Sequence, residues 1–272
     1  MARNEDYVES DYLVAAGKLL APVKARSHAL LKLRRGFWVL DVACGTGIDT
    51  RAMARHVGCE GRVCGIDTDP DMVAIAQMRA REAGLEATVD HHVASPDALP
   101  YCDGQFSAVR SERLFTDLTN PAAVLAEMVR VTAPGGRVVV VDTDWGTLSV
   151  TSEYVDVERR LARVRAERCL ANGYSGRQLL RLFQQAGLTS MQVELHALIV
   201  DDEELARFIT RLDEVEAEAE RSGVVTGDEL ARWRDEQASL DEQGLYFGCA
   251  TLVSVAGERP VDGCVSPAPH VG

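Results

Sequence analysis

A chain of 272 residues is long enough to bury a large core, and its composition, 46% hydrophobic and 26% charged, is that of a globular α/β protein. The formal net charge of −13 disfavours nucleic-acid and anionic-membrane partners, which need a basic surface. No run approaches the roughly 18 apolar residues of a membrane span, and the N-terminus lacks a signal-like apolar segment, so we expect a cytoplasmic protein. Seven scattered cysteines without a C-x-x-C pair predict neither disulfides nor a metal site.

The N-terminal segment predicts a helical cap. Residues 5–33 carry an uneven apolar stripe that indicates one or two helices, with a break at Pro22. We expect this cap, residues 1–35, to lie over the open edge of a ligand-binding crevice.

A strand, a glycine-rich loop and a helix are expected in residues 36–50. Phe37 to Val42 form a nearly continuous apolar run, which predicts a strand buried on both faces in a parallel sheet. Gly45 and Gly47 allow the backbone to turn sharply and to approach a ligand closely. Such a loop between a strand and a helix predicts the nucleotide crevice of an open α/β sheet.

The spacing of the glycines separates two interpretations of this loop. A nicotinamide-binding turn requires Gly-x-Gly-x-x-Gly or a final Ala, whereas the third small position here is Thr50. Asp41 precedes Gly45 by four residues, where a carboxylate would repel a pyrophosphate and suits a cationic ligand better. The string 39–47, VLDVACGTG, resembles the first motif of the class I S-adenosylmethionine-dependent methyltransferases, whose ligand carries an ammonium and a sulfonium.

Later segments carry the same resemblance. Asp67 ends the next short strand, where a doubly wound sheet places the carboxylate that binds both ribose hydroxyls. In the family, the turn after the fourth strand, residues 109–113, lines the methionine half of the cofactor. The Pro-Gly-Gly turn at 134–136 is a further family mark. The resemblance covers roughly residues 35–145 and is closest to the ubiquinone/menaquinone methyltransferase-like and natural-product branch.

The resemblance implies S-adenosylmethionine as the cofactor, with S-adenosylhomocysteine as the product. The adenine end departs from the family pattern, because Ser95 replaces the usual acid and Pro96 lacks the backbone N–H that donates to the ring. Either Ser95 or Asp97 would then bind the adenine amino group. The residues expected to contact the cofactor are Asp41, Ala43, Cys44, Gly45, Thr46, Gly47, Asp67, Thr68, Met72, Ser95, Pro96, Asp97 and Ser111.

The expected fold is α/β, a doubly wound, seven-stranded Rossmann-like sheet that is mostly parallel, with the last strand antiparallel. We expect the fifth strand at 137–142 and one helix over 202–222. The expected regions after the cap are a cofactor-binding core (36–145), the rest of the sheet (146–257) with a helical lid (about 201–243), and a disordered tail (258–272).

Methyl transfer from a sulfonium needs chiefly alignment of the acceptor and exclusion of water. A general base would help an oxygen or nitrogen acceptor. Its candidates are Glu112, Asp142 and Asp144, and at most one of the two aspartates is expected to face the methyl group. The residues expected to line the acceptor pocket are Tyr7, Tyr12, Arg110, Phe115 and Trp145.

The leading hypothesis is a methyltransferase that acts on an O, N or C nucleophile of a small, fairly apolar acceptor in bacterial secondary metabolism. Two alternatives remain: a cofactor-retaining cyclase on the same scaffold, and a quinone-type C-methyltransferase. A non-catalytic scaffold protein is disfavoured by the intact Asp41, Gly45, Gly47 and Asp67. We expect a small-molecule partner, no nucleic acid and no membrane, and leave a homodimer open.

Overall fold

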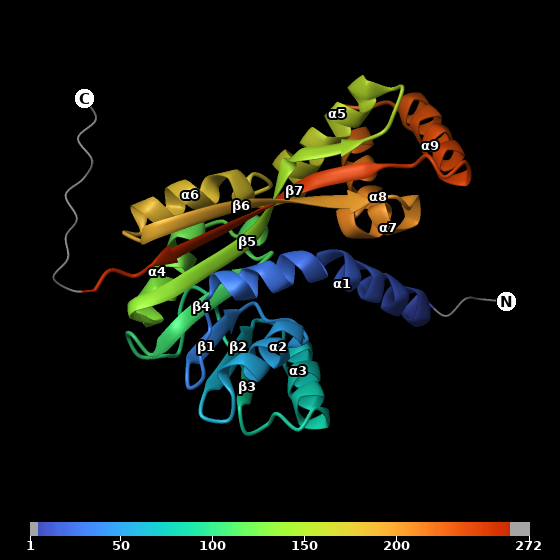
Figure 1. The fold of residues 1–272 in the computed structure, drawn as a ribbon. Helices are drawn as coiled ribbons and strands as arrows, with labels where there is room; N and C mark the ends of the chain where they lie inside the picture. The colour runs from blue at the N-terminus through green and yellow to red at the C-terminus, as the bar shows by residue number, and fades with distance from the viewer. Residues whose placement is uncertain (1–4, 262–272) are drawn as a thin grey trace, which may run out of the picture.

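The computed structural model describes residues 5–261, with side chains from residue 17 onward. Its centre is a mixed sheet of seven strands in the order β3-β2-β1-β4-β5-β7-β6 (Figure 1). β7 runs antiparallel to β5 and β6, and the other neighbouring strands are parallel. The expected fold class is therefore confirmed. The strands are β1 (Trp38–Val42), β2 (Arg62–Asp67), β3 (Val89–Val93), β4 (Phe106–Glu112), β5 (Thr132–Val150), β6 (Thr189–Val200) and β7 (Gly248–Glu258).

Helices cover both faces of the sheet. One face packs on α4 and α6, and the other on α1, α2 and α3 (Figure 1). The helices are α1 (Glu5–Leu30), α2 (Ile48–Val57), α3 (Pro70–Glu82), α4 (Pro121–Val131), α5 (Val155–Val164), α6 (Ser175–Gln185), α7 (Glu203–Thr210), α8 (Leu212–Arg221) and α9 (Gly227–Glu242), with a 3-10 turn at Phe115–Asp117 and a π-helical turn at Arg165–Cys169. No helix in the described range is long and apolar enough to cross a bilayer.

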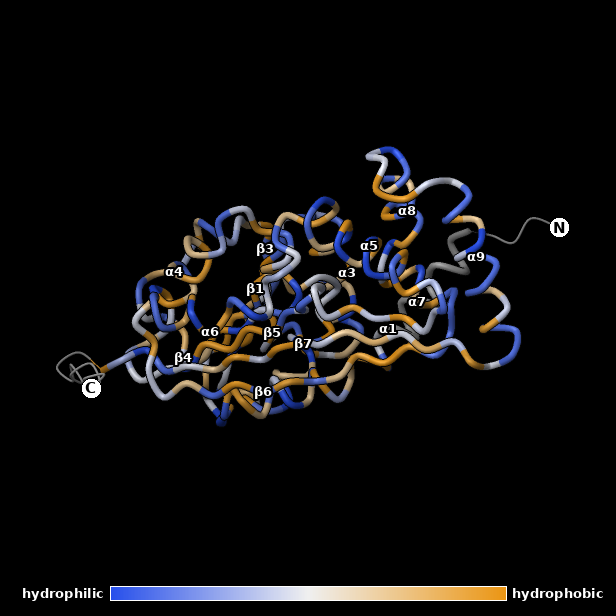
Figure 2. Tube along the Cα trace, turned by 90° about the horizontal axis from the view of Figure 1, so that it is seen from above, coloured by the Kyte–Doolittle hydropathy of each residue, from blue (hydrophilic) through white to orange (hydrophobic). Residues whose placement is uncertain are grey.

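The two faces explain the apolar run of the first strand. Val39 packs toward α1 and α2, whereas its neighbour Leu40 packs into the cluster that contains α4 and α6, and both are fully buried. Successive side chains of a strand point to opposite faces, so a strand covered on both sides needs apolar residues throughout. Figure 2 shows the resulting hydrophobic colouring along the central strands.

The N-terminal helix corrects one expectation. α1 continues through Pro22, where a break was expected. A proline inside a helix costs about 3 kcal/mol through a lost hydrogen bond and a steric clash. Leu20, Val23 and Leu30 are buried against the sheet, and this packing offsets the cost.

The fifth strand is much longer than the expected 137–142. Beyond Asp144 it bulges and then pairs again with β7, Ser149 opposite Cys249 and Val150 opposite Gly248. This partner comes from a distant part of the chain, so the local sequence pattern does not predict the extension.

The extended strands carry a second, smaller helical region, which we call the helical unit: α5, α7, α8 and α9 (Figure 1). It has its own apolar core, in which Trp233 is the largest buried side chain. The single helix expected over 202–222 is wrong, because Arg211 adopts φ 49° and separates α7 from α8. The expected tail beyond residue 261 lies outside the described residues.

Candidate active site

The glycine-rich loop connects the carboxyl end of β1 to α2. Gly45 has φ 50°, and no atom lies within 4 Å of where its Cβ would be, so a ligand can approach this backbone. Gly47 has φ 70°, and a Cβ there would lie 2.8 Å from His91 Nε2. Ala43 also has a left-handed backbone, φ 61°, which is uncommon for a residue with a side chain. Gly45 therefore leaves the loop accessible to a ligand, whereas Gly47 allows the loop to pack closely against His91.

Asp67 holds this loop from the carboxyl end of β2. One carboxylate oxygen accepts a hydrogen bond from Gly45 N at 2.8 Å, and the other accepts from Asp69 N at 3.1 Å. Each oxygen keeps a further lone pair for a hydroxyl donor. The open backbone of Gly45 beside a half-buried carboxylate leaves room for a ligand with hydroxyl donors.

His91 on β3 supports the loop from beneath. Its Nε2 lies 2.9 Å from Thr50 Oγ1, and that hydroxyl donates to Gly47 O at 3.0 Å. The single hydroxyl proton is thereby used, so Nε2 carries the proton that Thr50 accepts. Burial, reinforced by Arg51, lowers the pKa of His91 to about 4 and keeps the ring neutral. The ring is thus part of the loop's support.

The other predicted cofactor residues lie around the same edge of the sheet. Ser95 donates a hydrogen bond to Asp97, and both side chains are exposed after β3. The Ser111 hydroxyl donates to Val42 O at 3.0 Å, so it is engaged within the sheet. Thr46 accepts from Arg79, and Cys44 is buried under the loop. Thr68 is exposed after β2, whereas Met72, near the start of α3, and Pro96 are half-buried.

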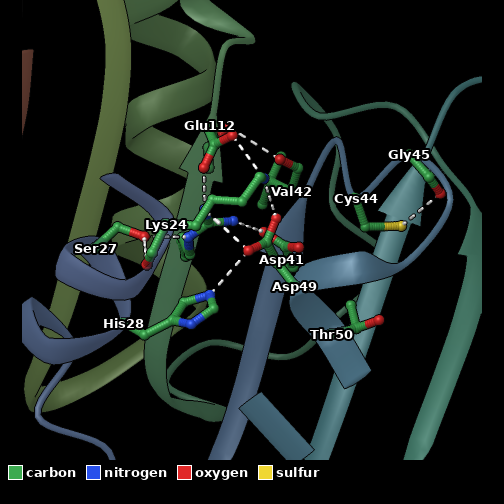
Figure 3. Close-up of polar contacts among 12 residues, drawn as sticks. Lys24, Ser27, His28, Asp41, Val42, Cys44, Gly45, Asp49, Thr50 and Glu112 are labelled. Carbon is green, nitrogen blue, oxygen red and sulfur yellow. Dashed lines mark hydrogen bonds and ion pairs between the residues drawn. The ribbon is translucent and has the colours of Figure 1, made fainter. Parts of the chain in front are cut away.

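A buried cluster of charged side chains lies behind the loop (Figure 3). Arg110 Nη1 on β4 donates to Asp41 on β1 at 3.0 Å, and Arg110 also pairs with Glu112. Lys24 on α1 bridges Glu112 at 2.7 Å and Asp49 at 2.5 Å. We call this set the charged cluster; its members are Lys24, Ser27, His28, Asp41, Asp49, Arg110 and Glu112.

The members of the charged cluster pair with one another. Arg110 and Lys24 face three carboxylates, and His28 Nε2 lies 3.0 Å from Asp49. Burial opposes ionisation of Asp49, but Arg110, His28 and Lys24 together hold its pKa below the usual range. Asp41, expected to meet a cationic ligand, therefore has a protein cation as its direct partner.

Sequence reasoning missed the α1 members of this cluster and Asp49. One signal was available: Arg110 lies in a strand expected to be buried, and a buried guanidinium needs carboxylate partners. Nothing in the local pattern indicates that Lys24 and His28 supply the remaining contacts.

The three predicted catalytic acids are all engaged. Asp142 is fully buried and accepts from the backbone N–H groups of Thr116 and Thr143 at 3.1 and 2.7 Å. Burial raises its pKa to about 6, although these backbone donors oppose the rise. Asp144 accepts from Arg177 Nε at 2.6 Å, and Glu112 belongs to the charged cluster. Each carboxylate already has donors from the protein.

The predicted substrate residues are dispersed. Arg110 belongs to the charged cluster, and Phe115 is fully buried in the core beside α4 and α6. Tyr7 and Tyr12 lie in α1, but their side chains are outside the described residues. Of the three whose side chains the structure describes, Trp145 alone lines the apolar cavity of the protein.

An apolar cavity lies between the extended strands and the helical unit. It encloses about 620 Å³ of space between atoms, part of it open to solvent. β5 contributes Trp145 and Leu148 to the wall that it shares with its sheet neighbours β7 and β6, and the remaining walls come from α5, α7, α8 and α9. The charged or aromatic residues of its wall that sequence reasoning missed are Glu158, Arg165, Trp233 and Tyr246.

Comparison with known proteins identifies the class. Residues 39–136 match the family described as "Methyltransferase domain". The chain is 32% identical over 228 residues to an uncharacterized 37.1 kDa protein of a Streptomyces fradiae transposon, covering 84% of this chain and 64% of that protein. It is 35% identical over 119 residues to the ubiquinone/menaquinone biosynthesis C-methyltransferase UbiE of Hydrogenovibrio crunogenus, covering 44% of this chain. The chain spans 47% of the length of that enzyme.

Solved structures share the fold. A geranyl diphosphate C-methyltransferase from Streptomyces coelicolor, in complex with S-adenosyl-L-homocysteine, superposes with a TM-score of 0.56 at 21% identity, covering 95% of this chain and 87% of that one. The [4+2]-cyclase SpnF superposes with a TM-score of 0.54 at 22% identity, covering 88% and 81%. The resemblance expected from sequence is confirmed: residues 39–136 match a methyltransferase domain, and the chain is similar to S-adenosylmethionine-dependent methyltransferases in this part of its sequence and in its fold.

Proposed function

We propose that this protein transfers the methyl group of S-adenosylmethionine to an O, N or C nucleophile of a small, fairly apolar acceptor. The observation that carries the proposal is the apolar cavity that begins at Trp145, directly after the acids of β5. Concave sites with mainly apolar walls are typical of small-molecule binding. Bacterial secondary metabolism is the setting that we propose for such an acceptor.

The protein's own residues would bind and align the reactants. Asp67 would accept hydrogen bonds from two ribose hydroxyls while Gly45 allows close backbone approach. The cofactor, when bound, supplies a methyl group already activated by the sulfonium. The apolar walls of the cavity would hold the acceptor nucleophile in position for transfer of this methyl group. A buried apolar site excludes competing water.

We also propose that α7, α8 and α9 act as a lid over the acceptor. Leu212, Val215 and Trp233 of these helices lie in the cavity wall, so their displacement would open it. Closure of such elements after binding would complete the apolar enclosure.

The cyclase alternative has one supporting observation. All three candidate acids are engaged by protein donors, so the cavity offers enclosure more readily than a free general base. Reactions that need only a held conformation would suit such a site.

Two measurements test the proposal. Native mass spectrometry of the purified protein should detect S-adenosylmethionine or S-adenosylhomocysteine, and calorimetry should show binding of either. Incubation with methyl-deuterated cofactor and a panel of small apolar acceptors should then yield a labelled product. Absence of cofactor binding contradicts the proposal. A bound cofactor with an unlabelled isomer of the acceptor would favour the cyclase.

A further inference from the structure

Two buried donors in the cavity wall lack partners. Arg165 is only 4% exposed and Trp233 only 2%, and both line the cavity. Neither Arg165 Nε nor Trp233 Nε1 has a hydrogen-bond partner among the described residues. A guanidinium and an indole N–H can only donate, so the complementary group must be an acceptor.

The positive charge of Arg165 is also without an ion pair in the described part of the chain. Arg165 Nη1 donates to the backbone oxygen of Thr210, and its guanidinium carbon lies 3.9 Å from the centroid of the Trp145 ring. Both contacts orient the guanidinium, but neither supplies a negative charge. Every other buried arginine of the core, Arg110 and Arg137, has a carboxylate partner.

Glu158 is not an ion-pair partner of Arg165, although it lines the same cavity. Its carboxylate accepts from Val150 N at 2.9 Å and pairs with Arg159. The negative charge of Glu158 is thereby paired at contact distance, whereas Asp117 and Glu214 act on the positive charge of Arg165 only from beyond ion-pair distance. Burying an unpaired cation is costly, and proteins accept that cost at functional sites.

The backbone around Arg165 is unusual as well. Arg165 begins the π-helical turn Arg165–Cys169 that follows α5. π-helical turns are rare and occur frequently at functional sites.

We propose that the cavity binds a small apolar molecule carrying a carboxylate, with Arg165 pairing with the carboxylate and Trp233 donating to it. This inference rests on the proposed function, because it assigns the acceptor to the class of hydrophobic acids. The apolar walls hold the body of the ligand, while Trp145 stacks beneath the guanidinium and keeps it oriented.

The test compares two probes that differ in one group, 4-phenylbutyrate and 4-phenylbutan-1-ol. Calorimetry at pH 7.5 should show that the acid binds the wild-type protein at least tenfold more tightly than the alcohol, as expected for a charge-assisted hydrogen bond. Arg165→Met should reduce this ratio to about one. Arg163→Met is the matched control, because Arg163 lies two residues earlier on α5 and its side chain is 76% exposed; it should keep the full ratio.

The ratio of the two affinities distinguishes recognition from structure. A variant that merely loosens the helical unit weakens both probes equally, and Arg165→Lys, which keeps the charge, should retain part of the preference. Equal binding of the two probes to the wild type, no binding of the acid, or a preference retained by Arg165→Met would overturn the proposal. No cofactor is added in this titration, and both probes are compared on the same preparation, so its outcome can be distinguished from that of cofactor binding, which tests the proposed function separately.

Discussion

Asp41 and Arg110 occupy opposed positions on neighbouring parallel strands, and Arg110 donates to Asp41 at 3.0 Å with both side chains about 1% exposed. The pair joins β1 to β4 directly below the glycine-rich loop. Lys24 of α1 pairs with Asp49 and Glu112, which Arg110 also contacts, so Arg110 links the sheet to the N-terminal helix through these two carboxylates.

Arg110→Met should destabilise the fold by about 3–5 kcal/mol, because it leaves buried carboxylates without their cation. Urea unfolding monitored by circular dichroism would measure the change. Arg62→Met is the control, since Arg62 pairs with Asp90 across β2 and β3 at 2.6 Å but is 44% exposed. It should cost at most about 1 kcal/mol. Equal losses for the two variants would show that burial does not determine how much the Asp41–Arg110 pair contributes to stability.

Gly47→Ala should damage the loop more than Gly84→Ala. The two glycines have nearly the same backbone, φ 70° and 66°, so the conformational cost of about 1 kcal/mol is shared. Only Gly47 is crowded, with His91 Nε2 at 2.8 Å from the added Cβ, whereas Gly84 has open space. We expect an additional loss of about 1–3 kcal/mol in unfolding free energy and weaker cofactor binding. Indistinguishable unfolding curves for the two variants would show that crowding at Gly47 does not affect stability.

Asp67→Ala should weaken S-adenosylmethionine binding by about one to two orders of magnitude, because two hydroxyls lose their acceptor at about 1–3 kcal/mol. Asp71→Ala, one helical turn away on the exposed start of α3, should change it little. Isothermal calorimetry on both variants decides the matter. The assignment of Asp67 fails if the two affinities agree.

Asp142 should make stability depend on pH. Burial raises its pKa to about 6, so the folded state holds the proton more tightly than the unfolded state. The resulting stability is fully present below about pH 4 and is lost as pH rises through about 6. The unfolding free energy of the wild type minus that of Asp142→Asn should therefore fall by about 1.4 kcal/mol per pH unit in this window. Denaturant titrations from pH 4 to 7 test this, with Asp97→Asn as the exposed control.

The role of the candidate acids in turnover can be tested with Asp142→Asn, Asp144→Asn and Glu112→Gln. Because each carboxylate already has donors from the protein, we expect each variant to retain turnover within about tenfold once folding is confirmed. A general base would instead cost about 10²–10⁴-fold in turnover with cofactor affinity unchanged. A loss of that size in one variant alone would identify that acid as the base.

The strands, loop and helices around Gly45 and Asp67 could be predicted from sequence because their signals are local. Gly45 and Gly47 follow a short apolar strand directly, and Asp67 repeats the pattern of a strand ending in an acid. Each signal depends on a few neighbouring residues and on the fixed geometry of a strand-to-helix turn. Pro70 and Asn120 likewise mark helix starts, and the structure has α3 and α4 beginning there.

The helical unit and the strands that carry it could not be predicted, because their features depend on distant partners. β5 extends to Val150 only because β7 supplies its hydrogen bonds from a hundred residues further along the chain. In the sequence, Arg165 is indistinguishable from an exposed charge on an amphipathic helix. Its burial depends on distant residues, among them Thr210 at the end of α7. Lys24 is similar, since both of its carboxylate partners belong to other elements.

The continuity of β5 from the core into the helical unit has a mechanical consequence. A region joined by a flexible loop can swing freely, but this one is attached through paired strands, β5 with β7 and β7 with β6. Displacement of the helical unit must bend or twist these hydrogen-bonded strands, which resist deformation and favour return to the original position. The register shift between Asp144 and Ser149 is the weakest place in the β5–β7 ladder, so bending should concentrate there, next to Trp145. Displacing the helical unit to open the cavity would then also strain the strands beside Trp145.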